Sequence, residues 1–485
     1  MPRGKAIMIQ GTGSHVGKSV LTTAICRILR QDGYRVAPFK SQNMANNAAV
    51  CADGGEIGRA QAEQAEACGI EPTTAMNPIL LKPSSDVGSQ VVVLGKATGH
   101  MTAKEYQAHK LSLLPIVRQS LDSLMDTYDV VVIEGAGSPA EINLKAFDIV
   151  NMRTAAMADA AVLLVGDIDK GGVFAQLVGT FELLDDSERA RIRALIINKF
   201  RGDIDILTPG IRYLEERLQK PVLGVVPFLK DMRIAEEDTV PEDRIDCPVT
   251  STLRIDVIQH PRISNFTDFN VFGDVVRFVT RPPPDFPDAI ILPGTKSTAA
   301  DLRVLRERGF EPWLKLAHAA GVEIVGICGG FQMLGRAILD PQHVESSEDG
   351  IEGLGFLETT TVFHEEKQTA RIRGTHVESG HEVAGYEIHM GCTQGNEETR
   401  PVFRISERHG MSVDGYDGLQ SSDGRVWGTY IHGVFDSRNF LNWWLERIRP
   451  GSSCREHPIE NRFDAVANAV RKSIDVEQLH RIIWR

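Results

Sequence analysis

The sequence predicts an α/β protein of two domains, each built around a largely parallel β-sheet. Its 485 residues exceed what one hydrophobic core usually organises. Short runs rich in valine and isoleucine alternate with helix-length stretches, as in parallel sheets with crossover helices. An acidic, proline-containing stretch interrupts this rhythm near residue 240. We therefore expect domains at residues 1–235 and 253–449, a linker at 236–252 and a C-terminal helical appendage at 450–485.

The first domain contains six short apolar runs, each followed by glycine or polar residues, which is typical of buried parallel strands. The predicted strands cover residues 6–10, 35–39, 130–134, 161–166, 194–198 and 222–226. A helix is expected over residues 20–30, directly after the first strand and its glycine-rich turn.

The same rhythm resumes after the linker and predicts a second α/β domain. Its expected strands cover residues 253–259, 289–293, 322–327 and 426–431, and an apolar helix is expected over 440–448. The last residues have helical spacing at Val466, Val470 and Ile474 but no recognisable chemistry. We interpret them as a packing appendage.

Composition excludes several classes of protein. A net charge of -12, without a concentrated basic segment, argues against a nucleic-acid binder. Seven scattered cysteines without a CxxC pair suit a reducing compartment better than a disulfide framework. No signal-peptide layout is present, and no apolar run reaches the roughly 18 residues of a membrane span. We expect a cytoplasmic enzyme; the oligomeric state is not predicted.

A phosphate-binding loop follows the first strand. Residues 11–19 read GTGSHVGKS, so Gly13 and Gly17 lie in a turn between a strand and a helix. In that context backbone N–H groups can surround phosphates, Lys18 can neutralise their charge and Ser19 can bind Mg²⁺. Thr12 stands where the first glycine of the usual motif is found, so this is a variant loop. We expect ATP to bind here.

Carboxylates are needed to complete a Mg²⁺ site beside the nucleotide. Glu134 ends the strongly apolar run DVVVIE and is the favoured candidate; the alternative is a strand-end carboxylate in solvent. Asp53 is a second candidate. Lys40, which ends the second predicted strand, is expected over the γ-phosphate.

The second domain contains a candidate nucleophile, Cys328, between a predicted strand and helix. Gly-x-Cys-x-Gly surrounds it, which allows the tight turn that presents a nucleophile to its substrate. His432 ends another predicted strand and is the expected base, which would help form the reactive thiolate. Gly294, in the turn LPGTKST, and Gly329 are expected to offer N–H groups to an oxyanion.

Together these features resemble the cobyric acid synthase family of glutamine amidotransferases, from about residue 5 to 447. The matching segments are QNMANNAAV (42–50), DGGEIGRAQAEQA (53–65), MNPILLKP (76–83), EGAGSPAEINL (134–144), VGDIDKGGVFA (165–175), INKFRGD (197–203), LPGTKST (292–298), GICGGFQMLG (326–335) and YIHGVFD (430–436). The resemblance implies a phosphate-loop domain of the dethiobiotin synthetase type, followed by a class I glutaminase.

The resemblance also implies roles for single residues. Ser19, Asp53 and Glu134 fall on metal-ligand positions, Lys18 and Lys40 on phosphate contacts, Asn198 on an adenine-reading position, and Cys328 and His432 on the nucleophile and base. Class I glutaminases usually carry glutamate two residues after the histidine, but Val434 stands there, so a dyad without an orienting carboxylate is expected.

Two further departures from the family are mild. Its Lys-Pro-Gln-Asn-Met run has Ser41 in place of proline, and its Asp-Arg-Gly-Gly run has Lys170 in place of arginine. Lysine keeps the charge but loses the planar fork of arginine.

The reaction implied by the resemblance amidates the b, d, e and g carboxylates of adenosylcobyrinic a,c-diamide, with ATP, Mg²⁺ and glutamine. ATP would convert a carboxylate to an acyl phosphate, and Cys328 and His432 would release ammonia from glutamine, which predicts a sheltered path between the domains. Two alternatives stay open: a ligase for the a and c carboxylates or another polyacid, and a regulatory or partitioning ATPase with an inactive glutaminase-like module. The intact Cys328 and His432 argue against the second.

Overall fold

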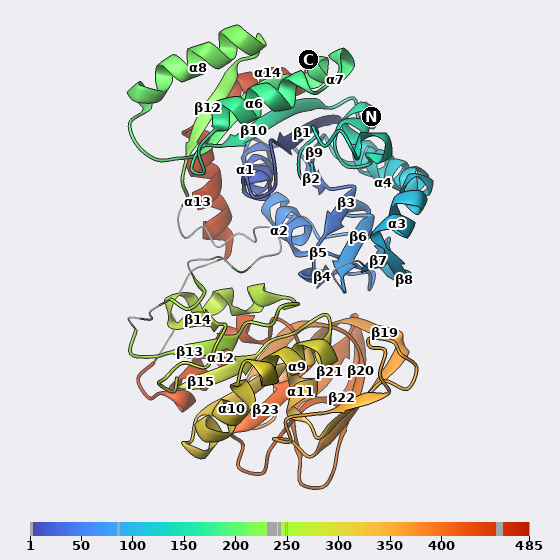
Figure 1. Ribbon diagram of the computed structural model, residues 1–485, viewed down its shortest axis with the longest axis vertical. Helices are drawn as coiled ribbons and strands as arrows, with labels where there is room; N and C mark the ends of the chain where they lie inside the picture. The colour runs from blue at the N-terminus through green and yellow to red at the C-terminus, as the bar shows by residue number, and fades with distance from the viewer. Residues whose placement is uncertain are drawn as a thin grey trace.

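The computed structural model describes residues 3–84, 88–229, 240, 244–247, 249, 251–452 and 459–484. The chain forms two lobes stacked along the long axis of the molecule (Figure 1). The upper lobe contains residues of the first half of the chain, and the lower lobe contains most of the second half. The predicted fold class, a phosphate-loop domain followed by an amidotransferase-like α/β domain, is confirmed.

The first lobe is organised by a six-stranded sheet in which all paired strands are parallel. In spatial order the strands are β12 (Val222–Pro227), β11 (Ile192–Phe200), β10 (Ala161–Asp167), β1 (Lys5–Gly11), β9 (Val130–Glu134) and β2 (Val36–Phe39). Side chains alternate along each strand, so Met8 enters one apolar core while Ile7 and Ile9 enter the core on the opposite face. All six strands predicted for this domain form, with bounds shifted by at most two residues.

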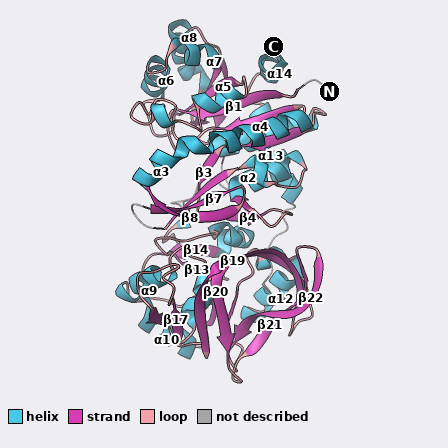
Figure 2. Ribbon diagram, turned by 90° about the vertical axis from the view of Figure 1, so that its right-hand side faces the viewer, coloured by secondary structure: helices cyan, strands magenta, loops and turns pink. Residues whose placement is uncertain are grey.

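Two small sheets extend the first lobe toward the second. One pairs β3 (Gln42–Met44), β6 (Ile79–Pro83), β7 (Gly88–Val93) and β8 (Lys96–Thr102), and the other pairs β4 (Ala48–Val50) and β5 (Glu56–Gly58). Figure 2 shows these strands between the main sheet and the lower lobe. The helices of the lobe are α1 (Lys18–Gln31), α2 (Arg59–Cys68), α3 (Ala103–Lys110), α4 (Leu114–Thr127), α5 (Met152–Met157), α6 (Val173–Glu182), α7 (Asp186–Arg191) and α8 (Ile204–Leu218).

The second lobe is built on a mixed sheet. Five strands run parallel in the order β14 (Val276–Val279), β13 (Ile255–Ile258), β15 (Ala289–Leu292), β16 (Glu323–Ile327) and β23 (Val426–Thr429). The sheet continues through β22 (Met411–Gln420), β21 (Arg400–Arg408) and β19 (Thr359–His376), with β20 (Glu382–Gly395) paired to β19, and ends with β17 (Ala337–Leu339) and β18 (Gly350–Glu352). Helices α9 (Thr298–Glu307), α10 (Phe310–Ala319), α11 (Gly329–Leu334) and α12 (Arg438–Ile448) pack around it.

The C-terminal helices α13 (Ile459–Arg471) and α14 (Val476–Trp484) return to the first lobe, where Figure 1 draws α13 in red beside blue α1 and α14 in red near the top of the lobe. Val466, Val470 and Leu479 are buried in the core between α1 and the main sheet. Arg27 of α1 forms an ion pair with Asp464 at 2.7 Å. The predicted helical spacing therefore reflects packing against the opposite end of the chain.

About half of the predicted linker, residues 236–252, lies outside the described residues. Of its described part, Val240 is buried in the core of the second lobe, and Ile245 forms a parallel bridge with Phe278 of β14.

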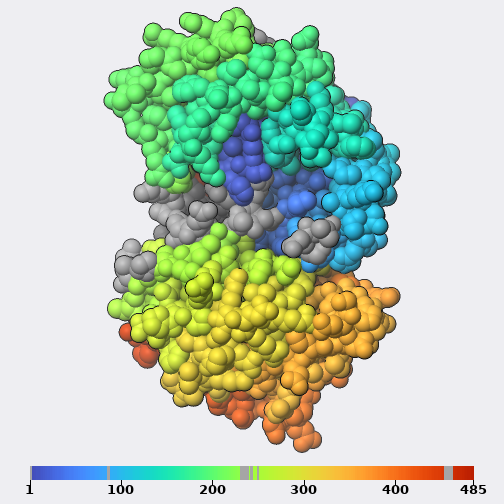
Figure 3. Space-filling model, viewed as in Figure 1, coloured from blue at the N-terminus to red at the C-terminus, as the bar shows by residue number. Residues whose placement is uncertain are grey.

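The two lobes meet through the small sheets. In Figure 3 the blue atoms of the first lobe lie against the green, yellow and orange atoms of the second lobe. A compact apolar cluster joins Ala48, Val50 and Leu80 of the first lobe to Tyr386 and Ile388 of β20. Beside it, Glu56 of β5 accepts hydrogen bonds from Lys367 of β19 at 2.7 Å and from Lys82 at 3.2 Å. The interface therefore combines apolar packing with buried ion pairs.

Within the part of the chain that the structure describes, no helix combines the length and the apolar character needed to cross a bilayer.

Candidate active site

The phosphate loop lies at the carboxyl end of β1, where it turns into α1. Gly17 has φ of 89°, a left-handed conformation that a side chain would strain, and α1 begins at the next residue. Lys18 folds back over the loop and donates a hydrogen bond to the carbonyl oxygen of Gly13 at 2.8 Å. Thr12, the variant position, has its backbone N–H bonded to the carbonyl of Val165 on the neighbouring strand β10.

Glu134 lies opposite this loop, because β9 is the direct neighbour of β1 in the parallel sheet. Its carboxylate is fully buried and accepts hydrogen bonds from Ser19 at 2.9 Å, from Lys40 at 2.7 Å and from Gln64 of α2 at 2.5 Å. Ser19, Lys40 and Glu134 were expected here from the sequence, and the structure brings them together. Gln64 was not expected, although Gln61 and Gln64 are spaced to share one face of a helix.

The Ser19 hydroxyl and the Glu134 carboxylate suit Mg²⁺, which prefers hard oxygen ligands and typically takes one or two carboxylates beside substrate phosphates. Asp53 does not join them. It is exposed in the turn between β4 and β5, where it accepts hydrogen bonds from the N–H of Gly55 and the hydroxyl of Thr74. Among the described residues, no cluster of three or more His, Cys, Asp or Glu side chains forms a metal site.

Asn198, expected to contact adenine, lies two residues before the end of β11 and is buried. Its side-chain N–H donates to the carbonyl oxygen of Val16 at 2.8 Å. In this arrangement Asn198 supports the phosphate loop from the strand side.

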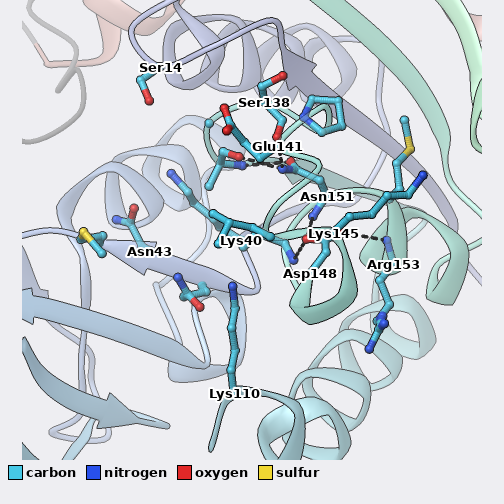
Figure 4. Close-up of a pocket in the computed structure, with 18 of the residues that line it drawn as sticks. Ser14, Lys40, Asn43, Lys110, Ser138, Glu141, Lys145, Asp148, Asn151 and Arg153 are labelled. Carbon is cyan, nitrogen blue, oxygen red and sulfur yellow. Dashed lines mark hydrogen bonds between the residues drawn. The ribbon is translucent and has the colours of Figure 1, made fainter. Parts of the chain in front are cut away.

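A cavity of about 700 Å³ opens beside the phosphate loop (Figure 4). Its walls come from the loop, from the end of β2, from β3 and from the segment after β9; they include Ser14, Lys40, Asn43, Lys110, Gly137 and Arg153. Figure 4 shows Lys110 pointing from the end of α3 toward the middle of the cavity, where Lys40 also lies. Burial lowers the pKa of Lys110, although Asp148 opposes this effect. The cavity can therefore present cations to an anionic substrate next to bound nucleotide.

Cys328 lies at the turn between β16 and α11. Its φ of 51° and ψ of -109° are strained for a side-chain-bearing residue, as at the nucleophile turns of hydrolases. Gly330 permits the turn, because a Cβ there would come within 1.9 Å of the carbonyl oxygen of Leu292. The Cys328 sulfur is 3.6 Å from the carbonyl oxygen of Ile388, which belongs to the strand facing the first lobe.

His432 lies just beyond β23, beside Cys328, and is buried. Its Nδ1 donates a hydrogen bond of 2.7 Å to the carboxylate of Asp268. Burial opposes protonation of the imidazole, but the charge and hydrogen bond of Asp268 and the contact with Cys328 outweigh it and raise the pKa of His432 to about 10. The nucleophile and base predicted from the sequence are therefore adjacent.

The predicted dyad is wrong, because an orienting carboxylate is present. Val434 is buried at the position where class I glutaminases usually carry glutamate, and Asp268 supplies the carboxylate from the 3₁₀ segment η5 (Phe266–Val275). The sequence offered no signal for Asp268, which lies 164 residues before the histidine and in no recognised motif.

The two predicted oxyanion glycines lie next to this group. A Cβ on Gly294 would come within 3.0 Å of His432 Cε1, and one on Gly329 would come within 3.1 Å of the N–H nitrogen of Thr295. The turn after β15 and the turn after β16 therefore meet beside the thiol, where backbone N–H groups can face a tetrahedral oxyanion.

Comparisons with known proteins assign each half of the chain to a known family of domains. The family described as the CobQ/CobB/MinD/ParA nucleotide binding domain matches residues 7–241, and the CobB/CobQ-like glutamine amidotransferase domain matches residues 254–440. The chain is similar to the cobyric acid synthase of Desulforamulus reducens, at 48% identity over 505 residues covering 100% of this chain and 99% of the relative. Similar relatives are the cobyric acid synthases of Pelotomaculum thermopropionicum, at 47% identity covering 99% of this chain and 96% of the relative, and of Dehalococcoides mccartyi, at 48% identity covering 99% of both.

Proposed function

The chain belongs to the cobyric acid synthase family, and on that premise we propose that it amidates the b, d, e and g carboxylates of adenosylcobyrinic a,c-diamide. It is an ATP-dependent amide ligase with its own glutamine amidotransferase domain. The observation that carries the proposal is the presence, in one chain, of a phosphate loop beside a cation-lined cavity and of a Cys-His-Asp group in the second lobe.

The first lobe is proposed to activate the carboxylate. A carboxylate resists attack by ammonia because its carbon is a poor electrophile and its oxygen is a poor leaving group. Transfer of the γ-phosphoryl group of ATP to a substrate oxygen gives an acyl phosphate and ADP. Lys18 and Lys40 are placed to stabilise the charge on the transferring group.

Mg²⁺ would be held by Ser19 and Glu134 beside the nucleotide phosphates, where it supplies further charge neutralisation. Gly13, Gly17 and Asn198 are proposed to shape the nucleotide site. Asp53 is left out of this set, because the hydrogen bonds that its carboxylate accepts come from Gly55 and Thr74 and not from the residues around Glu134.

The second lobe is proposed to release ammonia. Cys328 attacks the side-chain amide of glutamine, and the N–H groups of the turns at Gly294 and Gly329 face the oxyanion that forms. His432 gives a proton to the departing ammonia, and Asp268 holds the ring in position for that transfer. Water then cleaves the thioester, which yields glutamate and restores the thiol.

Ammonia then attacks the acyl phosphate, which forms the amide and releases phosphate. The cytoplasm is the proposed compartment, since it supplies ATP and glutamine and keeps Cys328 reduced.

The decisive assay incubates the protein with Mg-ATP, glutamine and either cobyrinic a,c-diamide or cobyrinic acid, and follows the products by mass. We expect four successive amidations of the diamide, each with release of ADP and glutamate. Preferential amidation of cobyrinic acid at a and c would favour the ligase for those positions. ATP binding without glutamate or ADP release would favour a regulatory ATPase.

A further inference from the structure

The loop that carries Asp268 is bonded directly to the first lobe. The side-chain oxygen of Asn265 accepts a hydrogen bond from the N–H of Ala48 at 2.8 Å, and the side-chain oxygen of Asn47 accepts one from the N–H of Phe266 at 3.1 Å. Each asparagine therefore bonds to the backbone of the opposite lobe. Both are buried, with exposed fractions of 5% for Asn47 and 3% for Asn265.

The same loop sets the geometry of the glutaminase. The N–H of Asp268 donates to the carbonyl of Asn265 at 3.0 Å, and the N–H of Ser264 donates to the carbonyl of Gly294 at 2.8 Å. Displacing this loop would move both the partner of His432 and one of the two oxyanion turns. Shifts of about 1 Å in such groups can lower a rate by roughly 100-fold.

We infer that Asn47 and Asn265 are positioning residues of the glutaminase, through which the nucleotide-binding lobe holds Asp268 and Gly294 in working geometry. This inference rests on the proposed function, because it assigns these residues to the ammonia-releasing half of that reaction. Apolar packing already joins the lobes at Ala48, Val50 and Tyr386. The two asparagines add a fixed register, since buried side-chain oxygens that accept hydrogen bonds across the interface favour one geometry of the lobes over its neighbours.

The hydrogen bonds continue from this pair to the phosphate site. The carbonyl of Asn47 accepts a hydrogen bond from the N–H of Arg59, the first residue of α2, at 3.0 Å. Five residues further along the same helix, Gln64 donates to Glu134. The ten-residue helix α2 is thus hydrogen-bonded both to Asn47 and to the carboxylate of Glu134. The glutaminase is therefore expected to respond to occupancy of the nucleotide site.

The test compares the full-length protein with Asn265→Gly and Asn265→Asp. Glycine removes the side chain while accommodating the left-handed backbone, with φ of 52°, and aspartate keeps the acceptor oxygen. We expect Asn265→Gly to lower kcat for glutamine hydrolysis by roughly 10- to 100-fold with little change in KM. Asn265→Asp should recover most of this loss, and synthesis from ammonium chloride should stay at the parent rate in both.

The response to the nucleotide site is measured on the same proteins. Mg-ATP plus cobyrinic a,c-diamide should raise glutamate release by the parent protein about 5-fold or more, and should raise it much less in Asn265→Gly. Asn47→Ala should reproduce both effects from the first lobe, and it serves as the test if Asn265→Gly does not fold.

Failure of the proposed function and failure of the positioning role give different results. If the parent protein releases no glutamate from glutamine, the proposed function fails. If the parent is active and both asparagine variants match its kcat and its response to Mg-ATP and diamide, the positioning role alone is refuted. A variant that loses thermal stability and ammonia-dependent synthesis to the same degree as glutaminase activity would also refute it, because that pattern marks a purely structural contact.

Discussion

His432 is protonated over an unusually wide pH range, because its imidazolium lies between two groups that favour the charge. Asp268 accepts its Nδ1 proton at 2.7 Å, and Cys328 contacts the ring. With its pKa raised from 6.5 to about 10, this ion pair contributes stability that is complete below pH 6.5 and is lost as the pH rises through 10. A protonated imidazole at neutral pH suits its proposed role as the acid that expels ammonia.

Asp268→Asn tests how the negative charge of Asp268 affects His432. Amide replacement removes the negative charge facing His432, so the pKa of His432 should fall toward its ordinary value; Cys328 and the stacked ring of Tyr386, at 5.3 Å, still face the histidine. We expect glutaminase kcat to fall by roughly 10²- to 10⁴-fold and the basic limb of its pH profile to move to lower pH. Asp274→Asn, on an exposed residue of the same segment, is the control and should match the parent. If the basic limb of the pH profile did not move in Asp268→Asn, the assignment of Asp268 as the partner that raises the pKa of His432 would be contradicted.

Lys40→Met tests the activating site. The substitution removes a cation that is 1% exposed and 2.7 Å from Glu134, so both charge stabilisation at the phosphates and the pairing of Glu134 are lost. Synthesis should fall by about 10²- to 10³-fold with glutamine and with ammonia alike. ADP formation measures the effect, and Lys104→Met, on an exposed lysine, should leave it intact. If only the glutamine-dependent rate fell, Lys40 would serve ammonia release and not carboxylate activation, which would contradict its assignment.

The site residues that were predicted from the sequence share a local sequence pattern. Glu134 ends β9, Cys328 directly follows β16, and Ser19 lies in the first turn of α1, after the glycine-rich loop that follows β1. Each lies next to glycine or an apolar run, and a parallel sheet gathers the carboxyl ends of its strands along one edge. Asp268 and Gln64 have no such pattern, because only the tertiary fold brings them to His432 and Glu134. Their discovery required the structure.

At the scale of elements, the parallel strands were predictable because both faces of each strand are buried, which leaves continuous apolar runs such as that of β9. The strands β19 to β22 gave no such signal. They are antiparallel, half-exposed and rich in charged residues, so their sequence does not differ clearly from that of a loop. The small sheets of β3 to β8 were missed because several of their strands have only three residues.

Glu56→Gln tests the ion pairs between β5 and β19. Burial alone would raise the pKa of Glu56, but Lys367 and Lys82 lower it to about 2, so its stabilisation is complete above pH 4.5 and is lost as the pH falls toward 2. The neutral side chain would leave both lysines buried without their counter-charge. We expect a loss of about 3–5 kcal/mol in the free energy of unfolding, measured in urea at pH 7.

The matched control is Glu365→Gln, on an exposed residue of β19. It should change stability by less than about 0.5 kcal/mol. Equal effects of the two substitutions would show that the interdomain ion pairs contribute little.

At the scale of the whole molecule, the C-terminal helices pack in the same lobe as the N-terminal strand β1 and helix α1. The C-terminal helices seal the face of the first sheet that α1 leaves partly uncovered, and they connect the end of the second lobe back to the nucleotide-binding lobe. The sequence predicted these helices from their spacing, but their partner could not be inferred, because an apolar helix face carries no information on which surface it covers.

Leu479→Ala should therefore destabilise the first lobe, although residue 479 is remote from it in sequence. Leu479 is fully buried against the core of α1 and β1. We expect a loss of about 2–5 kcal/mol in the free energy of unfolding and a lower midpoint for the transition that Mg-ATP stabilises. Leu316→Ala, at a leucine that is 63% exposed, is the control. If Leu479→Ala changed only the unfolding transition of the second lobe, the packing of Leu479 in the first lobe would be contradicted.

The two lobes are proposed to divide the reaction: the second lobe releases ammonia, and the first lobe consumes it on an activated carboxylate. Cys328→Ser tests this division of labour most directly, with cobyrinic a,c-diamide and Mg-ATP supplied and the products followed by mass. Cys392→Ser, on an exposed cysteine, is the control. We expect Cys328→Ser to form no amide from glutamine but to form the tetra-amidated product from ammonium chloride at the rate of the control. Loss of synthesis from both nitrogen sources, or its survival with glutamine, would contradict this division of labour.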